Sequence, residues 1–207
     1  MQRVGFWIVA TGLAMAQTGN FAGHYYLQNL REVGSELLLR PNGTFEFMLA
    51  YGAADYSAKG TWRAQAGAVI LNSAAAKAAP PFGLIRSTAN REPAILVRVQ
   101  APNGRGIPNI DVVLGTAKGP LKARTDSSGD AEFPKDDPAQ SAAFSIRVYE
   151  LETEPVKLNP LHNEFVFEIN GEAITSVSFK DERLTVSGKG LIMRHWPDRE
   201  MRYEKEQ

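Results

Sequence analysis

Short apolar segments, separated by turn-forming sequences, are the feature that most limits how this chain can fold. Two of them, at 36–40 and 44–49, flank the pair Asn42-Gly43, whose residues tolerate the positive φ angles of a tight hairpin. A later segment, 143–149, alternates apolar and polar residues with the period of two that a half-buried strand shows. Strands that recur about every 8–12 residues are typical of β-sandwiches and barrels. The pattern therefore predicts an all-β protein.

Residues 1–16 carry the marks of a cleavable signal peptide. Arg3 supplies a short basic region, residues 4–13 form an apolar core, and Ala14-Met15-Ala16 is a small-x-small cleavage sequence. The core is too short for a membrane-spanning helix, which needs about 20 residues. A buried N-terminal helix of the mature fold is the alternative. We predict a soluble exported protein, periplasmic or extracellular, with no transmembrane segment in the mature chain.

The charge balance and the absence of cysteine exclude several classes of function. The chain has 23 basic and 23 acidic residues, so it lacks the excess positive charge of proteins that bind nucleic acids or anionic membrane surfaces. Without cysteine, the chain forms no disulfide, thiol nucleophile or thiolate metal site. The chain has only three histidines, which are few for a metal site built from histidine: His24, His162 and His195. We expect neither a metal nor any other cofactor.

Changes in composition divide the rest of the chain into four parts. Residues 17–73 form an N-terminal antiparallel β unit, and residues 74–92 an Ala/Pro-rich connector whose double proline stops any helix that the alanines begin. Residues 93–170 again alternate strands and turns, and residues 171–207 add further short strands. We predict one β domain at 93–170, between two segments of similar character.

Turns and strands follow one another in a distinctive order within 93–170. The sequence Asn-Gly-x-x-Ile-Pro at 103–108 precedes an apolar strand at 110–114, and Thr-Asp-x-x-Gly-x-Ala-x-Phe follows at 125–133. This order resembles the carboxypeptidase regulatory-like and transthyretin-related β-sandwich modules. The resemblance implies an immunoglobulin- or transthyretin-like sandwich that acts as a structural or adhesive spacer. Hydroxyisourate hydrolases share the fold, but their histidines and their Tyr-Arg-Gly-Ser C-terminus have no counterpart here.

The segment 23–71 carries a second set of short motifs. They are Gly23-x-Tyr25, Glu36-Leu37-x-Leu39, Asn42-Gly43-x-Phe45, Tyr51-Gly52-Ala53-x-Asp55 and Gly60-Thr61-Trp62. In these motifs the segment is similar to small bacterial lipocalin-like β domains of unassigned function. About four strands cannot close a barrel without leaving an edge, and 171–207 supplies more strands of the same kind. We predict that 17–73 and 171–207 pair into a lipocalin-like partial barrel around an inserted sandwich; two consecutive domains are the alternative.

Aromatic residues gather in these two terminal segments. Alternate residues of a barrel strand face inward, so some of them could line an apolar pocket that has polar groups for a ligand. The other interpretation is that they fill the core, as side chains of small barrels commonly do. Asp55 lies beside the aromatic group, where a turn-forming role competes with ligand binding. The candidate ligand-binding residues are Tyr25, Tyr51, Asp55, Trp62 and Tyr203.

The sequence assigns no catalytic residue and no metal ligand. Gly-x-Ser-x-Gly does not occur, and no pattern places His24 or His195 next to a nucleophile. Asp126 and Asp130 flank a glycine turn in a spacing that calcium could use. The simpler interpretation is that Asp126 caps the turn with its own side-chain oxygen.

Two functions from different classes remain. The first is an exported non-catalytic binding or scaffolding module, whose edge strands could pair with another exported protein by β-addition. The second is a lipocalin-like carrier of a small apolar ligand. A cavity of several hundred cubic ångströms inside the barrel would favour the carrier, whereas a solid core would weigh against it.

Overall fold

The computed structural model of the chain describes residues 21–74, 79–194 and 199–207. The signal peptide predicted at 1–16 and the candidate His195 lie outside these ranges. Within them the regular elements are strands, apart from one 3-10 turn, Arg147–Tyr149, and one short helix, α1 (Gly171–Thr175). The all-β prediction is confirmed. In the described ranges, neither helical element has the length and apolar character needed to cross a membrane.

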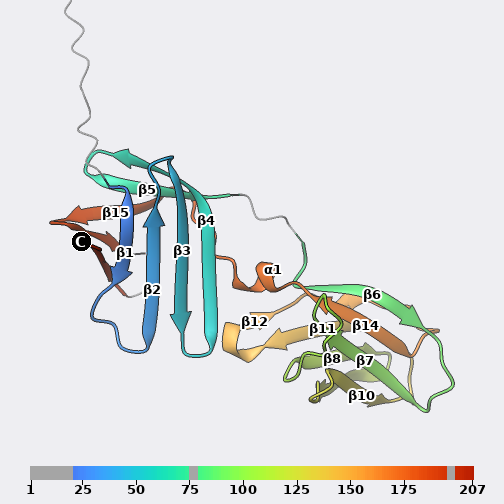
Figure 1. The fold of residues 1–207 in the computed structure, drawn as a ribbon. Coiled ribbons are helices and arrows are strands. Elements are labelled where there is room, and N and C mark those ends of the chain that lie inside the picture. Colours follow the sequence, from blue (N-terminus) through green and yellow to red (C-terminus); the bar gives the residue numbers. More distant parts are fainter. Residues whose placement is uncertain (1–20, 75–78, 195–198) are drawn as a thin grey trace, which may run out of the picture.

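Eight antiparallel strands form a closed barrel (Figure 1), in the order β1-β17-β16-β15-β5-β4-β3-β2. They are β1 (Gly23–Leu27), β2 (Val33–Leu39), β3 (Thr44–Tyr51), β4 (Ala54–Gln65), β5 (Ala68–Ser73), β15 (Glu182–Ser187), β16 (Gly190–Met193) and β17 (Met201–Lys205). The N- and C-terminal segments meet twice: Tyr25 lies opposite Lys205, and Leu71 lies opposite Glu182. The predicted pairing of the two segments is confirmed, and the barrel is closed rather than partial.

Two smaller sheets lie between β5 and β15 in the sequence, and we call them the two-sheet unit. One sheet, in the order β10-β7-β14-β6, consists of β6 (Phe82–Thr88), β7 (Ala94–Gln100), β10 (Asp130–Pro134) and β14 (Glu164–Ile169). The other, in the order β12-β11-β8-β9 with β13 paired to β11, consists of β8 (Asp111–Thr116), β9 (Gly119–Arg124), β11 (Ala139–Ile146), β12 (Leu151–Glu152) and β13 (Val156–Lys157).

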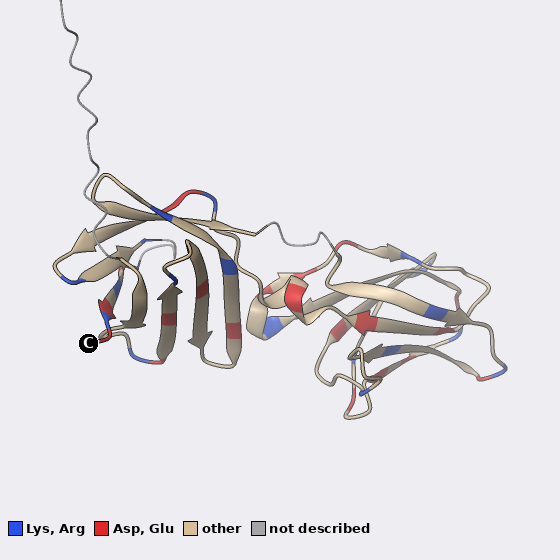
Figure 2. Cartoon of the chain, turned by 45° about the horizontal axis from the view of Figure 1, so that its top comes forward, with Lys and Arg blue, Asp and Glu red and all other residues tan. Residues whose placement is uncertain are grey.

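The two sheets of this unit share one core. Phe144 of β11 stacks on Phe82 of the opposite sheet, with 4.5 Å between ring centroids. It also meets Phe167 of β14 edge-on, at 4.6 Å. Acidic and basic residues are interspersed along the strands of this unit and of the barrel (Figure 2), in keeping with the balanced composition.

Strand β6 lies within 74–92, the range that the composition assigns to a connector. It pairs with β14, and its Phe82 is buried in the core between the sheets. Strand β6 lies at the edge of its sheet, and its residues after Phe82 are partly or fully exposed. Its sequence therefore lacks the alternation of apolar and polar residues from which a strand is predicted. A bulge near Ile85 interrupts its register with β14.

The barrel and the two-sheet unit meet around α1 and β4. Asn170 caps α1, because its side chain accepts a hydrogen bond of 3.2 Å from the Ala173 N–H. Just beyond α1, the Val177 N–H donates to the Ser57 carbonyl of β4 at 2.8 Å. Tyr56 of β4 meets Tyr149 edge-on, with 5.7 Å between ring centroids. Figure 1 shows α1 at this junction between the two units.

Candidate functional site

Side chains from both terminal segments pack the interior of the barrel. The buried cluster consists of Tyr25, Leu37, Leu39, Phe45, Phe47, Leu49, Ala58, Val69, Leu71, Phe179, Leu184, Leu191, Met193, Met201 and Tyr203. Phe179, from the segment that precedes β15, meets Phe47 edge-on with 5.1 Å between ring centroids. This packing weighs against a ligand at the centre of the barrel and agrees with the interpretation that the aromatic residues fill the core.

Tyr25 and Tyr203 lie in this core with their hydroxyl groups bonded to the protein. The Tyr25 hydroxyl donates to the Phe21 carbonyl at 2.8 Å. The Tyr203 hydroxyl lies 2.8 Å from Ser35 Oγ, which itself donates to the Met48 carbonyl at 2.6 Å. Burial raises the pKa of both tyrosines above the ordinary value. Both residues are neutral parts of the core, and their hydroxyl groups are engaged within the barrel.

Of the other three candidate residues, Trp62 packs against the same core, and Tyr51 and Asp55 do not belong to it. Tyr51 and Asp55 are exposed at the hairpin end of the β3–β4 pair. Trp62 is half-buried near the other end of β4, and its indole N–H donates to the Arg40 carbonyl at 2.9 Å. The structure therefore gathers Tyr25, Tyr203 and Trp62 around one core and leaves Tyr51 and Asp55 exposed outside it. A role of these residues in ligand binding stays a prediction.

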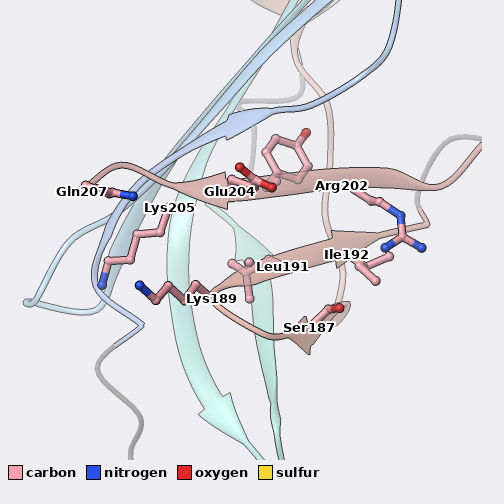
Figure 3. A pocket seen from close by; sticks show the side chains of 10 residues that line it. Ser187, Lys189, Leu191, Ile192, Arg202, Glu204, Lys205 and Gln207 are labelled. Carbon is pink, nitrogen blue, oxygen red and sulfur yellow. The ribbon is translucent and has the colours of Figure 1, made fainter.

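A hollow of about 350 Å³ lies beside β16 and β17 (Figure 3). Ser187, Lys189, Gly190, Leu191, Ile192, Arg202, Tyr203, Glu204, Lys205 and Gln207 line it. Charged side chains of both signs project from its walls, and Arg202 contacts Glu200 at 2.6 Å. Its lining is about equally polar and apolar and carries charges of both signs, so it does not select one class of ligand.

An apolar cleft of about 440 Å³ lies at the end of the two-sheet unit that α1 covers, and we call it the junction cleft. Ile107, Pro108, Asn109, Ile110, Arg124, Ile146, Arg147, Val148, Tyr149, Ile169, Gly171, Ile174 and Thr175 line it. Sites for small molecules are concave, mostly apolar and roughly 300–1,000 Å³ in volume. The junction cleft meets these criteria, and its lining is the most apolar of the hollows described here.

Thr125 and the loop before β8 shape one wall of the cleft. The buried Thr125 hydroxyl donates to the Ile107 carbonyl at 2.8 Å and accepts from the Ile110 N–H at 2.9 Å. Gly106 lies directly against the backbone of Ser128, where a Cβ atom would collide with the carbonyl group. The motifs at 103–108 and 125–133 are therefore in contact, and their contact positions the isoleucines of the wall.

Asp126 caps the turn next to this wall. Its carboxylate accepts hydrogen bonds from the Asp130 N–H at 3.0 Å and the Ser128 N–H at 2.8 Å. These bonds, led by the one from Asp130, lower the pKa of Asp126. The Asp130 carboxylate accepts from Arg98 at 3.1 Å. The two carboxylates that suggested calcium thus serve the turn and an ion pair.

Two arginines in the lining of the cleft share one carboxylate beside it. Arg124 donates through Nε to Asp111 Oδ1 at 2.7 Å and through Nη2 to Oδ2 at 3.1 Å. Arg147 donates through Nε to Asp111 Oδ2 at 2.9 Å. Hydrogen bonds from the arginines, chiefly Arg124, lower the pKa of Asp111, so this carboxyl group is ionised at neutral pH. Two cations and one anion leave one net positive charge at the cleft.

The sequence reasoning missed this cluster, although its residues are ordinary cross-strand neighbours. Asp111 lies opposite Arg124 on β9 and opposite Ser145 on β11, two residues before Arg147. Opposite charges at facing positions of adjacent strands stabilise a sheet. Once the register of β8, β9 and β11 is known, the cluster follows from it, but the register is not visible in the sequence.

A serine–histidine contact lies on β6 and the loop before β14. Ser87 Oγ is 2.7 Å from His162 Nδ1, and His162 Nε2 is 3.3 Å from Asn159 Nδ2. In a Ser-His-Asp triad the second ring nitrogen donates to a carboxylate, which orients the base. Here an amide occupies that place, so the contact does not reproduce the triad.

Comparisons with models of protein families, with curated proteins and with solved structures found no match. The resemblances of 93–170 and 23–71 to known modules therefore stay predictions. The function must therefore be inferred from the structure itself, in which the junction cleft is the best candidate for a binding site.

Proposed function

We propose that this chain is an exported, non-catalytic binding protein that holds a small apolar ligand, or the apolar part of one, in the junction cleft. In this proposal the barrel supports the site, and the two-sheet unit is a sandwich module of the carboxypeptidase regulatory-like or transthyretin-related kind. The signal-peptide pattern at 1–16 supports export. The observation that carries the binding function is the apolar lining of the junction cleft.

Apolar surface left open in the cleft supplies the driving force for binding. Val148 is 44% exposed, although it belongs to a lining made mostly of apolar residues. Removing apolar surface from water is favourable by about 25 cal/mol per Å². A ligand that covers Val148 and the partly exposed isoleucines of the lining, Ile107, Ile169 and Ile174, gains this free energy. The preformed walls limit the entropy lost on binding.

A scaffolding function through β6 is the second candidate. Leu84 and Ile85 are exposed on this edge strand, and an extended segment of another protein could pair with it. However, a bulge at Ile85 and the charged Arg86 make the edge less regular, and both features oppose strand addition. The cleft is therefore the preferred site.

Fluorescence of the neutral apolar dye N-phenyl-1-naphthylamine tests the proposed function. We expect saturable enhancement with one dye per protein, and at least about tenfold weaker binding by Val148→Trp, because the larger side chain fills the cleft. Ile85→Trp is the matched control: it replaces an aliphatic residue that is 52% exposed outside the cleft, and it should bind like the wild type. Absence of saturable binding, or equal binding by Val148→Trp, would refute the proposal.

A further inference from the structure

We infer that the ligand of the junction cleft is a small amphipathic monoanion, whose apolar tail lies in the cleft and whose carboxylate lies at Arg147 and Arg124. The inference rests on the proposed function and adds the chemical class of the ligand. It combines three features of one place: an apolar cavity, a net positive charge and guanidinium donors that remain available.

The charge at the cleft has one sign once the ion pairs are counted. Arg124 and Arg147 are the charged residues among those that line the cleft, and the ionised Asp111 outside the lining offsets one of them. On neighbouring elements, Glu150 and Glu172 are exposed to solvent and outside the lining, where water and salt screen them. A single negative charge on a ligand therefore balances the site.

Hydrogen bonding favours Arg147 as the group that receives the anion. A guanidinium has five N–H donors, and Arg147 commits only its Nε–H to Asp111. The described residues offer its two terminal nitrogens no other acceptor, and the side chain is 77% exposed. Arg124, in contrast, has already used one edge of its guanidinium for both oxygens of Asp111.

Asp111 thus acts as a positioning residue for the proposed anion site. It fixes Arg147 through Nε and leaves the terminal nitrogens of that guanidinium for a carboxylate, which binds arginine well in a bidentate arrangement. A ligand need not displace Asp111 in order to bind. The anion can therefore bind while both Asp111 oxygens keep their arginine partners.

The apolar walls next to these arginines suit a hydrocarbon tail better than a second polar group. Ile110, Ile146, Ile169 and Ile174 are contributed by three strands or their ends and by α1, and they surround the cleft from several sides. A dianion or a sugar would leave polar groups against these walls without hydrogen-bond partners, which is costly. A carboxylate with a medium-length alkyl chain fits both parts of the site.

Displacement of N-phenyl-1-naphthylamine by decanoate and by decanol, below micelle-forming concentrations, tests the inference on the full chain. We expect decanoate to displace the dye from the wild type at about tenfold lower concentration than decanol, and added salt to reduce this preference. Arg147→Gln should weaken the binding of decanoate about tenfold more than it weakens the binding of decanol, because only decanoate carries the charge that Arg147 balances. Arg86→Gln, which alters an ion-paired arginine that is 59% exposed on β6, should behave as the wild type.

The outcomes separate this inference from the proposed function. If the dye binds but decanoate and decanol compete equally, the monoanion inference is wrong while the cleft still binds apolar molecules. If decanoate is preferred but Arg147→Gln keeps that preference, the assignment of the anion to Arg147 is wrong. If the wild type does not bind the dye, the proposed function itself fails.

Discussion

The barrel and the two-sheet unit both have full apolar cores, but they differ in what they leave open. The barrel closes on itself, and its buried tyrosines Tyr25 and Tyr203 find hydrogen-bond partners within its own strands and flanking backbone. The two-sheet unit ends in loops, and there Val148 and the Arg147 guanidinium remain accessible. Closure removes the sheet edges of the barrel, and its own side chains fill the interior, whereas the pair of open sheets leaves ends at which a site can form.

The largest expected effect is a loss of stability when a core residue of the barrel is truncated. Tyr203→Ala should lower the free energy of unfolding by about 3–5 kcal/mol, because it leaves a cavity beside β17 and its N-terminal neighbour β1. Tyr203→Phe keeps the ring and should cost only about 1 kcal/mol. Urea unfolding measures both values. If Tyr203→Ala lowers the unfolding free energy only slightly, the barrel interior is not tightly packed, and the contrast with the open end of the two-sheet unit fails.

A smaller effect is expected where two loops of the two-sheet unit touch. Gly106→Ala should destabilise the chain by roughly 2 kcal/mol and weaken dye binding, because the new methyl group pushes the cleft wall away from Ser128. Gly83→Ala is the control, since Gly83 lies in the same unit and has open space around it. Thermal unfolding and dye titration report the two effects. Equal behaviour of the two variants would contradict the role of this contact.

The smallest expected effect is on the pH dependence of stability, to which Asp111 of the two-sheet unit contributes. The pKa of Asp111 in the folded protein lies below the value of about 3.9 in an unfolded chain, so its stabilising contribution is present above that pH. The contribution is lost as pH falls through the lowered folded-state pKa. Asp111→Asn should therefore reduce the unfolding free energy by less than about 1 kcal/mol at pH 7, and the difference from the wild type should shrink toward pH 2.

Denaturant unfolding at several pH values gives this difference directly. Asp55→Asn is the control, because Asp55 is an exposed carboxylate that takes no part in the ion pairs of Asp111 with Arg124 and Arg147. A difference between Asp111→Asn and the wild type that stays constant from pH 7 to pH 2 would show that the ion cluster is not its source.

Local patterns in the sequence were enough to predict strands and turns. The Asn42-Gly43 pair lies at the turn between β2 and β3, where Gly43 has a φ angle of 80°. Strand β6 escaped detection because an edge strand buries few of its residues and so lacks alternation. Tyr25 and Tyr203, predicted to face the inside of a barrel, do lie in its core. Periodicity alone does not separate residues that fill a core from residues that bind a ligand.

The sequence by itself determined the β character of the chain, its turns and the similarity between its two terminal segments, because these follow from backbone preferences and from the period of apolar residues. Only the tertiary structure decided that the barrel is closed and packed, and that Arg124 and Arg147 meet at Asp111 beside an apolar cleft. The physical reason is register: a shift of one residue between strands turns side chains to the opposite face, and short-range patterns do not set it across long connections.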